Sequence, residues 1–313
     1  MAVNKVQFQK GMSLRDFLKQ YGAEEQCREA LLKWKWPEGY VCPMCGYHKG
    51  CKIKRRGVYQ CNRCHHQTSL TAGTIFDSTK LPLRTWFLAM YLMTQSKNGV
   101  STLEMTRHLG VSYRTAWRLR HKLMEVMYER NENRKLKGDI ELDDAYLGGQ
   151  RSGGKRGRGA PGKIPFLAAV EKNKQEHPIY MKLSRLEGFS GQEIESWVGD
   201  NLQPGSTVVS DGLQCFSSVG KAGCIHKTKR VGSHKQAVLE PSFHWVNTAL
   251  GNIKNSLQGT FHVVFDKYAH RYLAEFQYRF NRRFDLPSMF ARLAYVSTHT
   301  TPRPEWLLKL AEI

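Results

Sequence analysis

Five of the eight cysteines lie in a short stretch between positions 42 and 64. Four of them form two CxxC pairs, Cys42 with Cys45 and Cys61 with Cys64, which are separated by 15 residues. Two such pairs supply the tetrahedral sulfur ligands that Zn²⁺ prefers, so we predict one zinc ion. Because four protein ligands leave no open position, this zinc should be structural. Four reduced cysteines without a metal would not explain the pairing. Other potential ligands fit the spacing less well: His48, Cys51, His65 and His66.

Two aspartates follow apolar, strand-like segments. Asp143 ends the run IELD, and Asp211 follows STVVS. Carboxylates that project from neighbouring strands can hold divalent ions, and such ions neutralise a scissile phosphate and activate a nucleophile. Aspartate at a strand end is also a common turn residue, so the residues alone leave both interpretations open.

Asn247 and Lys254 lie seven positions apart, which is about two turns of a helix. One helix face could therefore present an amide oxygen and an ammonium group to the same phosphate-binding cleft. The alternative is a helix-capping Asn247 and a solvent-facing Lys254, both of which are common.

The elements that must position these residues change in type along the chain. Apolar spacing predicts helices first and strands later. The expected helices cover residues 13–36, 85–94, the pair within 101–127, 190–202 and most of the chain after 242, and the expected strands cover 140–149, 164–171, 178–186 and 206–212.

The helix pair STLEMTRHLGVSYRTAWRLRHKL has the layout of a helix-turn-helix, with the turn at Gly110. Apolar residues of its second helix recur at helical spacing, which predicts an exposed face of Tyr113, Arg114, Arg118 and His121. We favour DNA contact because this face is basic, although a plain helical hairpin has the same pattern.

A Gly-rich segment, residues 148–162, cannot pack a core. It is either a solvated loop or a flexible basic loop that binds phosphates through Arg151, Lys155, Arg156 and Arg158. A second set of basic residues lines the predicted hairpin between the CxxC pairs and is also a candidate for DNA contact: Lys52, Lys54, Arg55 and Arg56.

Composition restricts the class of protein. The 313 residues carry a formal net charge of +21, which favours a polyanionic partner. Hydrophobic residues make up 41% of the chain, enough for a buried core and too many for a disordered chain. We see no apolar stretch of about 20 residues and no secretory h-region, so we expect a soluble, cytoplasmic protein without membrane contact.

Several motifs in order make the chain resemble the insertion-sequence transposases of the DDE superfamily that carry an N-terminal zinc ribbon. They are CPMCG, YQCNRCHHQTSLTAGTIFDSTKLPLRTWFLAMYL, ELDDAYLGG, SDG, VNTALGNIKNSLQGTFH and EFQYRFNRR. Each motif alone is weak, but the combination is specific and spans most of the chain.

The resemblance implies an RNase H-like catalytic domain from about residue 138. It implies that Asp143 and Asp211 are the first two metal ligands, and that Asn247 stands where the superfamily usually has a third acid. Lys254 matches the basic residue that follows. The four residues match the Asp-Asp-Asn-Lys variant of this site, and the resemblance implies two catalytic Mg²⁺ or Mn²⁺ ions. Asp144 should point away from Asp143 because strand residues alternate in direction. Asp144 and Glu275 are the two other acids that could contribute to the metal site, but for Glu275 a structural pair with Arg279 or Arg282 is favoured, because these residues lie at helical pair spacing from it.

The expected fold class is therefore α/β, an RNase H-like mixed-sheet catalytic domain preceded by a zinc ribbon and a helix-turn-helix. We expect a helical segment over residues 1–39, the zinc ribbon over 40–72, the helix-turn-helix region over 73–132, and the catalytic domain with its C-terminal helices over 133–313.

The expected function is a transposase that binds the terminal inverted repeats of an insertion sequence and catalyses metal-dependent strand cleavage and strand transfer. Its partners would be double-stranded DNA, both terminal repeats and target, and further copies of the chain in a homodimer or higher assembly. The alternative is a non-catalytic zinc-ribbon DNA-binding protein, either a regulator or an inactivated transposase. An RNA-binding protein fits the charge but not the strand-rich second half.

Overall fold

The structure, a computed structural model, describes residues 9–131, 134–148, 162–230, 240–262 and 264–311. These residues form two compact units. The first unit contains the described residues up to Val126 together with those from Phe284 onward, and the second runs from Met127 to Arg283. None of the helices within the described ranges is long and apolar enough to cross a membrane.

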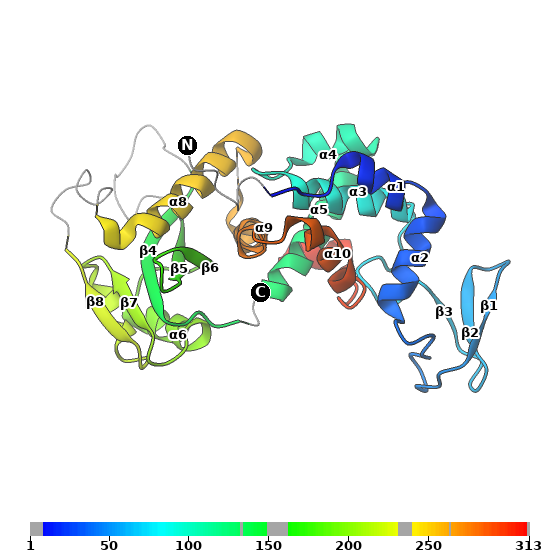
Figure 1. Ribbon diagram of the computed structural model, residues 1–313, viewed down its shortest axis with the longest axis horizontal. Helices are drawn as coiled ribbons and strands as arrows, with labels where there is room; N and C mark the ends of the chain where they lie inside the picture. Colours follow the sequence, from blue (N-terminus) through cyan, green and yellow to red (C-terminus); the bar gives the residue numbers. More distant parts are fainter. Residues whose placement is uncertain (1–8, 132–133, 149–161, 231–239, 263, 312–313) are drawn as a thin grey trace. The chain divides into compact units, whose positions relative to one another are not determined.

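The first unit is helical apart from one small antiparallel sheet (Figure 1). The sheet has the order β1-β2-β3. The helices and strands of the first unit are α1 (Leu14–Tyr21), α2 (Glu24–Lys35), β1 (Gly50–Ile53), β2 (Val58–Cys61), β3 (Gln67–Ser69), α3 (Leu83–Gln95), α4 (Thr102–Leu109), α10 (Leu286–Ser297), α11 (Glu305–Leu310) and most of α5 (Tyr113–Asn131).

The helix predicted over residues 13–36 is two helices. Ser13 caps α1 by accepting the backbone N–H of Asp16 at 3.1 Å. The chain turns at Ala23, which has extended backbone angles and whose N–H donates to the side chain of Gln26 at 2.9 Å. This local cap begins a second helix, so the prediction of one continuous helix was wrong.

An aromatic cluster forms part of the core of the first unit. Phe290 of α10 lies 5.6 Å from the ring of Phe17, 4.9 Å from Tyr21 and 5.8 Å from Phe87 between ring centroids. Both Phe17 and Phe290 are fully buried. Residues 284–311 therefore pack with the N-terminal helices, whereas the predicted boundaries grouped them with the catalytic domain. Contacts between segments so distant in the sequence produce no local sequence pattern, so the sequence did not predict this packing.

The second unit is a five-stranded mixed sheet with helices on both faces (Figure 1). The sheet order is β6-β5-β4-β7-β8; β4, β5 and β6 pair antiparallel, and β4, β7 and β8 pair parallel. The elements are β4 (Asp139–Leu147), β5 (Ile164–Lys172), β6 (Pro178–Arg185), α6 (Gly191–Asn201), β7 (Thr207–Ser210), β8 (Ile225–Thr228), α8 (His244–Ser256) and α9 (Ala269–Asn281).

Each face of the sheet has its own apolar core. Ile140 and Leu142 of β4 pack on one face in a cluster with residues of α6. Ala145 and Leu147 pack on the other face in a cluster with residues of α8 and α9. Odd-numbered residues of β4 thus face α8, as the alternation of strand side chains requires.

This mixed sheet confirms the predicted α/β fold class of RNase H-like type. The four predicted strands are present, and β8 is the strand that the sequence did not indicate. Three of its four residues are exposed, so it lacks the apolar alternation by which half-buried strands are recognised.

Candidate functional site

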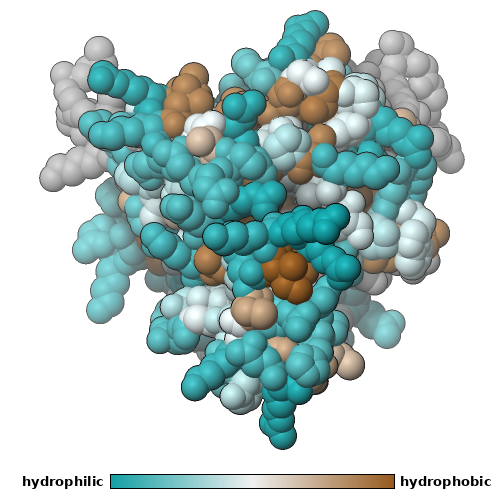
Figure 2. All heavy atoms as spheres, turned by 90° about the vertical axis from the view of Figure 1, so that its right-hand side faces the viewer, coloured by the Kyte–Doolittle hydropathy of each residue, from teal (hydrophilic) through white to brown (hydrophobic). Residues whose placement is uncertain are grey.

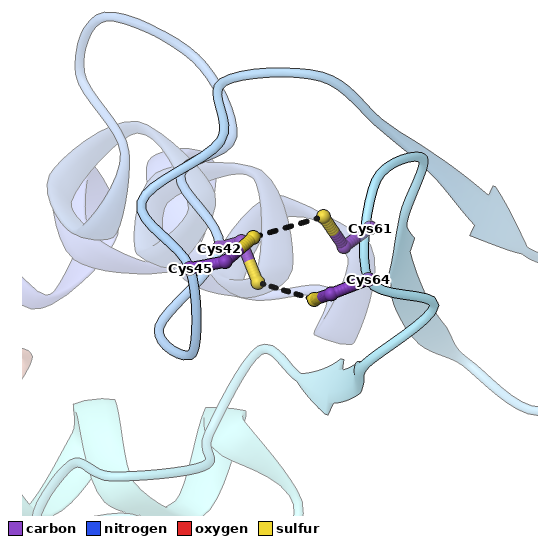
Figure 3. Close-up of side chains that lie close together, drawn as sticks. All are labelled: Cys42, Cys45, Cys61 and Cys64. Atoms are coloured by element: carbon purple, nitrogen blue, oxygen red, sulfur yellow. Dashed lines mark hydrogen bonds between the residues drawn. The ribbon is translucent and has the colours of Figure 1, made fainter.

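The four cysteines of the two CxxC pairs converge on one point (Figure 3). All four Sγ atoms lie within 4.8 Å of one another, and the Sγ atoms are 3.6 Å apart both for Cys42 with Cys64 and for Cys45 with Cys61. Sulfurs in a tetrahedral zinc site with bonds of about 2.3 Å are separated by about 3.8 Å. None of these cysteines is in a disulfide. The donor set and its spacing fit zinc.

The backbone forms the same tight turn at both pairs. Gly46 and His65, the residues that follow each pair, have left-handed φ angles of 68° and 56°. Their N–H groups donate to the carbonyl oxygens of Cys42 and Cys61 at 2.9 and 3.1 Å. Glycine adopts this conformation without steric cost, whereas His65 adopts it as a non-glycine residue.

The same turns prepare the thiols for metal binding. Burial raises the pKa of Cys42, but hydrogen bonds from the backbone N–H groups of Cys45 and Met44 and from the side chains of Cys64 and Cys45 together outweigh burial and lower this pKa to about 6. The pKa of Cys61 is also lowered against the effect of burial. A lowered pKa favours the thiolate, which is the form that binds metal. Within the described ranges, four other potential ligands lie outside this group: His48, Cys51, His65 and His66.

A second group of potential metal ligands lies in the second unit. One carboxylate oxygen each of Asp143, Asp144 and Asp211 lies within 4.8 Å of the others. The β4–β7 pairing ends at the partners Glu141 and Val209, and Asp211 directly follows β7. The aspartates therefore meet just beyond the paired part of these two strands. The structure brings together Asp143 and Asp211, which the sequence singled out.

Asp144 was expected to point away from this group, and that expectation was wrong. Its carboxylate reaches the other two, although Asp143 and Asp144 are consecutive strand residues. The backbone N–H of Asp144 also donates to Oδ1 of Asp143 at 2.9 Å. The Asp-Asp pair in the sequence was the signal for this third carboxylate.

The electrostatics of the acidic group favour a bound cation. Burial and the negative charges of Asp144 and Asp211 raise the pKa of Asp143 to about 7. The N–H of Asp144 and the positive charge of Lys254 act in the opposite direction but do not outweigh them. Close carboxylates that repel one another are stabilised by a divalent ion, so the residues present fit such a metal.

Asn247 and Lys254 both lie on α8, the helix that packs on the Asp143 face of β4. Asn247 is half-buried and lies in the first turns of the helix, while Lys254 is exposed two turns later. The charge of Lys254 acts on Asp143, which places the two groups in the same neighbourhood.

Glu275 forms an ion pair that its position in the sequence predicted. It is buried on α9, and its Oε1 lies 3.9 Å from Nη2 of Arg279, four residues further along the helix. It is outside the carboxylate group of Asp143.

The helix pair of the first unit has the predicted form. Ser101 caps α4, Gly110 ends it with a left-handed φ of 64°, and α5 follows within three residues. Tyr113 is 57% exposed. His121, in contrast, is fully buried and its ring stacks on Trp117 at 4.1 Å, so the prediction that His121 faces outward was wrong.

The two arginines of α5 make a contact that the sequence did not indicate. Glu305 of α11 forms ion pairs with Arg114 at 2.7 Å and with Arg118 at 3.1 Å. The arginine side chains remain 72% and 44% exposed.

The zinc-ribbon side also carries exposed basic residues. Figure 2 looks onto the side on which Figure 1 draws β1 and β2, and hydrophilic residues cover most of that face. The exposed residues of the hairpin include Lys52, Lys54, Arg55 and Arg56. The other predicted basic segment lies outside the described residues, with Arg151, Lys155, Arg156 and Arg158.

Comparisons with known proteins agree with these two sites. Residues 135–281 match the family model of the ISXO2-like transposase domain, and residues 22–67 match that of the transposase zinc-ribbon domain. Together the two matches cover more than half of the chain. A protein from Halobacterium salinarum, described as an uncharacterized protein in transposable element ISH50, is 24% identical over 216 residues, which cover 64% of this chain and 71% of that protein.

Solved structures of the Mos1 transposase complexes are also similar, but only weakly. The Mos1 strand transfer complex matches with 12% identity and a TM-score of 0.24, over 63% of this chain and 76% of the other. The Mos1 mariner paired end complex with Mn matches with 11% identity and a TM-score of 0.23, over 63% and 77%.

The two matches fall on the two sites, because the carboxylate group lies within the transposase-domain match and the four cysteines lie within the zinc-ribbon match. The chain belongs to the insertion-sequence transposases that carry an N-terminal zinc ribbon and an ISXO2-like transposase domain.

Proposed function

We propose that this protein binds the terminal inverted repeats of an insertion sequence and catalyses metal-dependent cleavage and transfer of DNA strands. The observation that carries the proposal is the convergence of the Asp143, Asp144 and Asp211 carboxylates within 4.8 Å in a chain of net charge +21. A basic protein attracts DNA, and a local acidic group in it needs a cation to approach a phosphate.

Asp143 and Asp211, with the amide oxygen of Asn247, would hold two Mg²⁺ or Mn²⁺ ions. When bound, such ions stabilise the charge that develops on the entering and leaving oxygens of a phosphoryl transfer. Asp144 is close enough to contribute a further oxygen. Because Asn247 is a neutral ligand, it adds less to cation affinity than a glutamate would.

The chemistry would proceed in two displacements at phosphorus. In the first, water attacks a phosphodiester at the element end, the bond to the 3′ oxygen breaks, and a 3′-OH is released. In the second, this 3′-OH attacks a phosphodiester of target DNA and displaces the 3′ oxygen there. Lys254 would bind a phosphate oxygen near Asp143 as a point charge.

The first unit would supply DNA recognition. Tyr113, Arg114 and Arg118 present polar groups from the first half of α5, the part of such a helix that enters the major groove. The basic hairpin of the zinc ribbon would contact phosphates. Because two element ends must be joined to one target, we expect a homodimer or larger assembly on DNA.

A cleavage assay tests the proposal. Purified protein is incubated with a labelled terminal-repeat duplex and Mg²⁺, and nicked and joined products are separated on denaturing gels. Asp143→Ala and Asp211→Ala should each lower the rate by more than about 100-fold, because even residues that only orient metal ligands are worth 10- to 100-fold. Binding of the duplex should persist in both variants. A double variant that still cleaves contradicts the site, and a wild-type protein that binds but never cleaves indicates a regulator.

A further inference from the structure

We propose that Glu141 is a positioning residue that holds α8, with Asn247 and Lys254, at its place beside Asp143. The proposal rests on the proposed function for its catalytic consequence, but its structural consequence can be measured separately. It concerns two hydrogen bonds between β4 and the first turn of α8.

The contacts of Glu141 are well defined. Its side chain is fully buried, and its Oε2 accepts the backbone N–H groups of Trp245 at 2.8 Å and Val246 at 2.9 Å. Its Oε1 lies 3.5 Å from Nζ of Lys172, which also pairs with Glu176. Lys172 therefore keeps a carboxylate partner if Glu141 is removed.

These bonds supply a cap that α8 otherwise lacks. The residue before the helix, Phe243, has no side chain that accepts a hydrogen bond from the first turn. The first N–H groups of a helix need acceptors, and a carboxylate at this end is favoured by the helix dipole. Glu141 provides the acceptor from a position 104 residues earlier in the chain.

The capping bonds lie next to the proposed catalytic groups. Glu141 and Asp143 are two positions apart on β4, so their side chains leave the same face of the sheet. Asn247 directly follows Val246 on α8. The distance between the Asp143 carboxylate and the α8 groups is thus set by a short path through two hydrogen bonds. Releasing them allows α8 to shift along the sheet, and misplacement of about 1 Å can cost a rate of about 100-fold.

Glu171 offers a matched control. It is buried to the same degree, with 1% exposure, and lies on β5 directly opposite Ile140, hence on the α6 face of the same sheet. Its carboxylate accepts bonds from Arg134 at 3.0 Å and from the backbone N–H of Lys137 at 3.3 Å. It has the chemistry and burial of Glu141 without its contact to α8.

The experiment compares Glu141→Ala, Glu141→Gln and Glu171→Ala in the full chain. Three quantities are measured: hydrogen exchange of the first turn of α8, the Mn²⁺ dissociation constant by electron paramagnetic resonance, and kcat and KM for cleavage of a terminal-repeat duplex. Glu141→Ala should speed exchange in this turn, weaken Mn²⁺ binding by about tenfold and lower kcat by about 100-fold, with KM nearly unchanged. Glu141→Gln should recover most of this loss, because one amide oxygen can accept both N–H bonds.

Glu171→Ala should leave Mn²⁺ affinity and exchange in α8 close to wild type, even if it lowers thermal stability. Equal losses in Glu171→Ala and Glu141→Ala would overturn the proposal, since both would then reflect general destabilisation. Wild-type behaviour of Glu141→Ala would also overturn it. If the wild-type protein binds Mn²⁺ but does not cleave DNA, the proposed function fails. The role of Glu141 is then still decided by two measurements, hydrogen exchange in the first turn of α8 and the affinity for Mn²⁺.

Discussion

At the scale of single residues, the sequence identified the right side chains where chemistry demands particular atoms. Four thiols in two CxxC pairs and two carboxylates after apolar strands converge as expected. Asp144 and His121 were misjudged, because both depend on which way a side chain leaves its element. Strand alternation predicted that the Asp144 carboxylate points away from Asp143, but one oxygen of each of the two carboxylates lies within 4.8 Å of the other.

The zinc-ribbon assignment predicts a clear difference between two cysteines of the same segment. Cys42→Ser removes a ligand from the converging group, so we expect zinc content to fall from about one ion per chain toward zero and the ribbon to unfold. Cys51→Ser is the control, because Cys51 is exposed and outside the group. Zinc is measured by atomic absorption after dialysis. Equal zinc loss in both variants would contradict the assignment.

At the scale of elements, contacts between helices matter more than their individual sequences. Glu305 of α11 pairs with Arg114 and Arg118, and hydrogen bonds from Lys309 and Arg114 lower its pKa to about 2. The carboxylate is therefore charged at every pH near neutral, and under the proposed function it would compete with DNA phosphates for the two arginines.

We predict that Glu305→Gln strengthens duplex binding about two- to fivefold, the value of one exposed ion pair. Arg114→Ala should weaken binding and reduce the slope of log affinity against log salt by about one, as expected for one lost phosphate contact. Glu104→Gln is the matched control, since it makes the same change of charge on α4 but pairs with His108. Fluorescence anisotropy over a salt series measures both effects. If Glu104→Gln gives the same gain, only net charge is responsible.

A second prediction at this scale concerns His270 of α9, which is 4% exposed and contacts Tyr128 edge to face at 5.1 Å. Burial, aided by the charges of Arg271 and Arg185, lowers its pKa from 6.5 to about 4. A depressed histidine pKa means that the folded state resists protonation, so stability is present above pH 6.5 and is lost as the pH falls toward 4.

Between pH 7.5 and pH 5 this group should reduce the free energy of unfolding of the second unit by about 2 kcal/mol. His270→Gln lacks the titrating ring and should show a correspondingly smaller decrease. Urea unfolding at the two pH values measures the difference. An equal decrease in wild type and variant would show that other groups cause the acid sensitivity.

At the scale of the whole molecule, the chain of the first unit is discontinuous. Its core includes Phe290 from the C-terminal segment beside Phe17 from the N-terminal one, and the second unit occupies the sequence between them. The ends of the chain thus complete one unit, which a boundary drawn along the sequence does not reveal.

This arrangement predicts that the first unit depends on residues after 284. Phe290→Ala should lower its free energy of unfolding by about 3–5 kcal/mol, the usual cost of removing a buried phenylalanine. A chain that ends at Arg283 should lose the protease resistance of α1 to α3 while the second unit stays resistant. Phe284→Ala is the control, because Phe284 is 48% exposed. Limited proteolysis with mass spectrometry reads out both units.

The sequence by itself determined the candidate ligands and most of the helices and strands. CxxC pairs, apolar strands and amphipathic helices are patterns among residues that are close in the sequence, so they can be recognised from the sequence alone. Only the tertiary structure decided which of these elements meet: Asp144 with Asp211, Glu305 with Arg114, Phe290 with Phe17, and Glu141 with the first turn of α8. Each of these pairings joins residues that are dozens to hundreds of positions apart. Which residues pair depends on how the whole chain packs, and sequence spacing does not predict this packing.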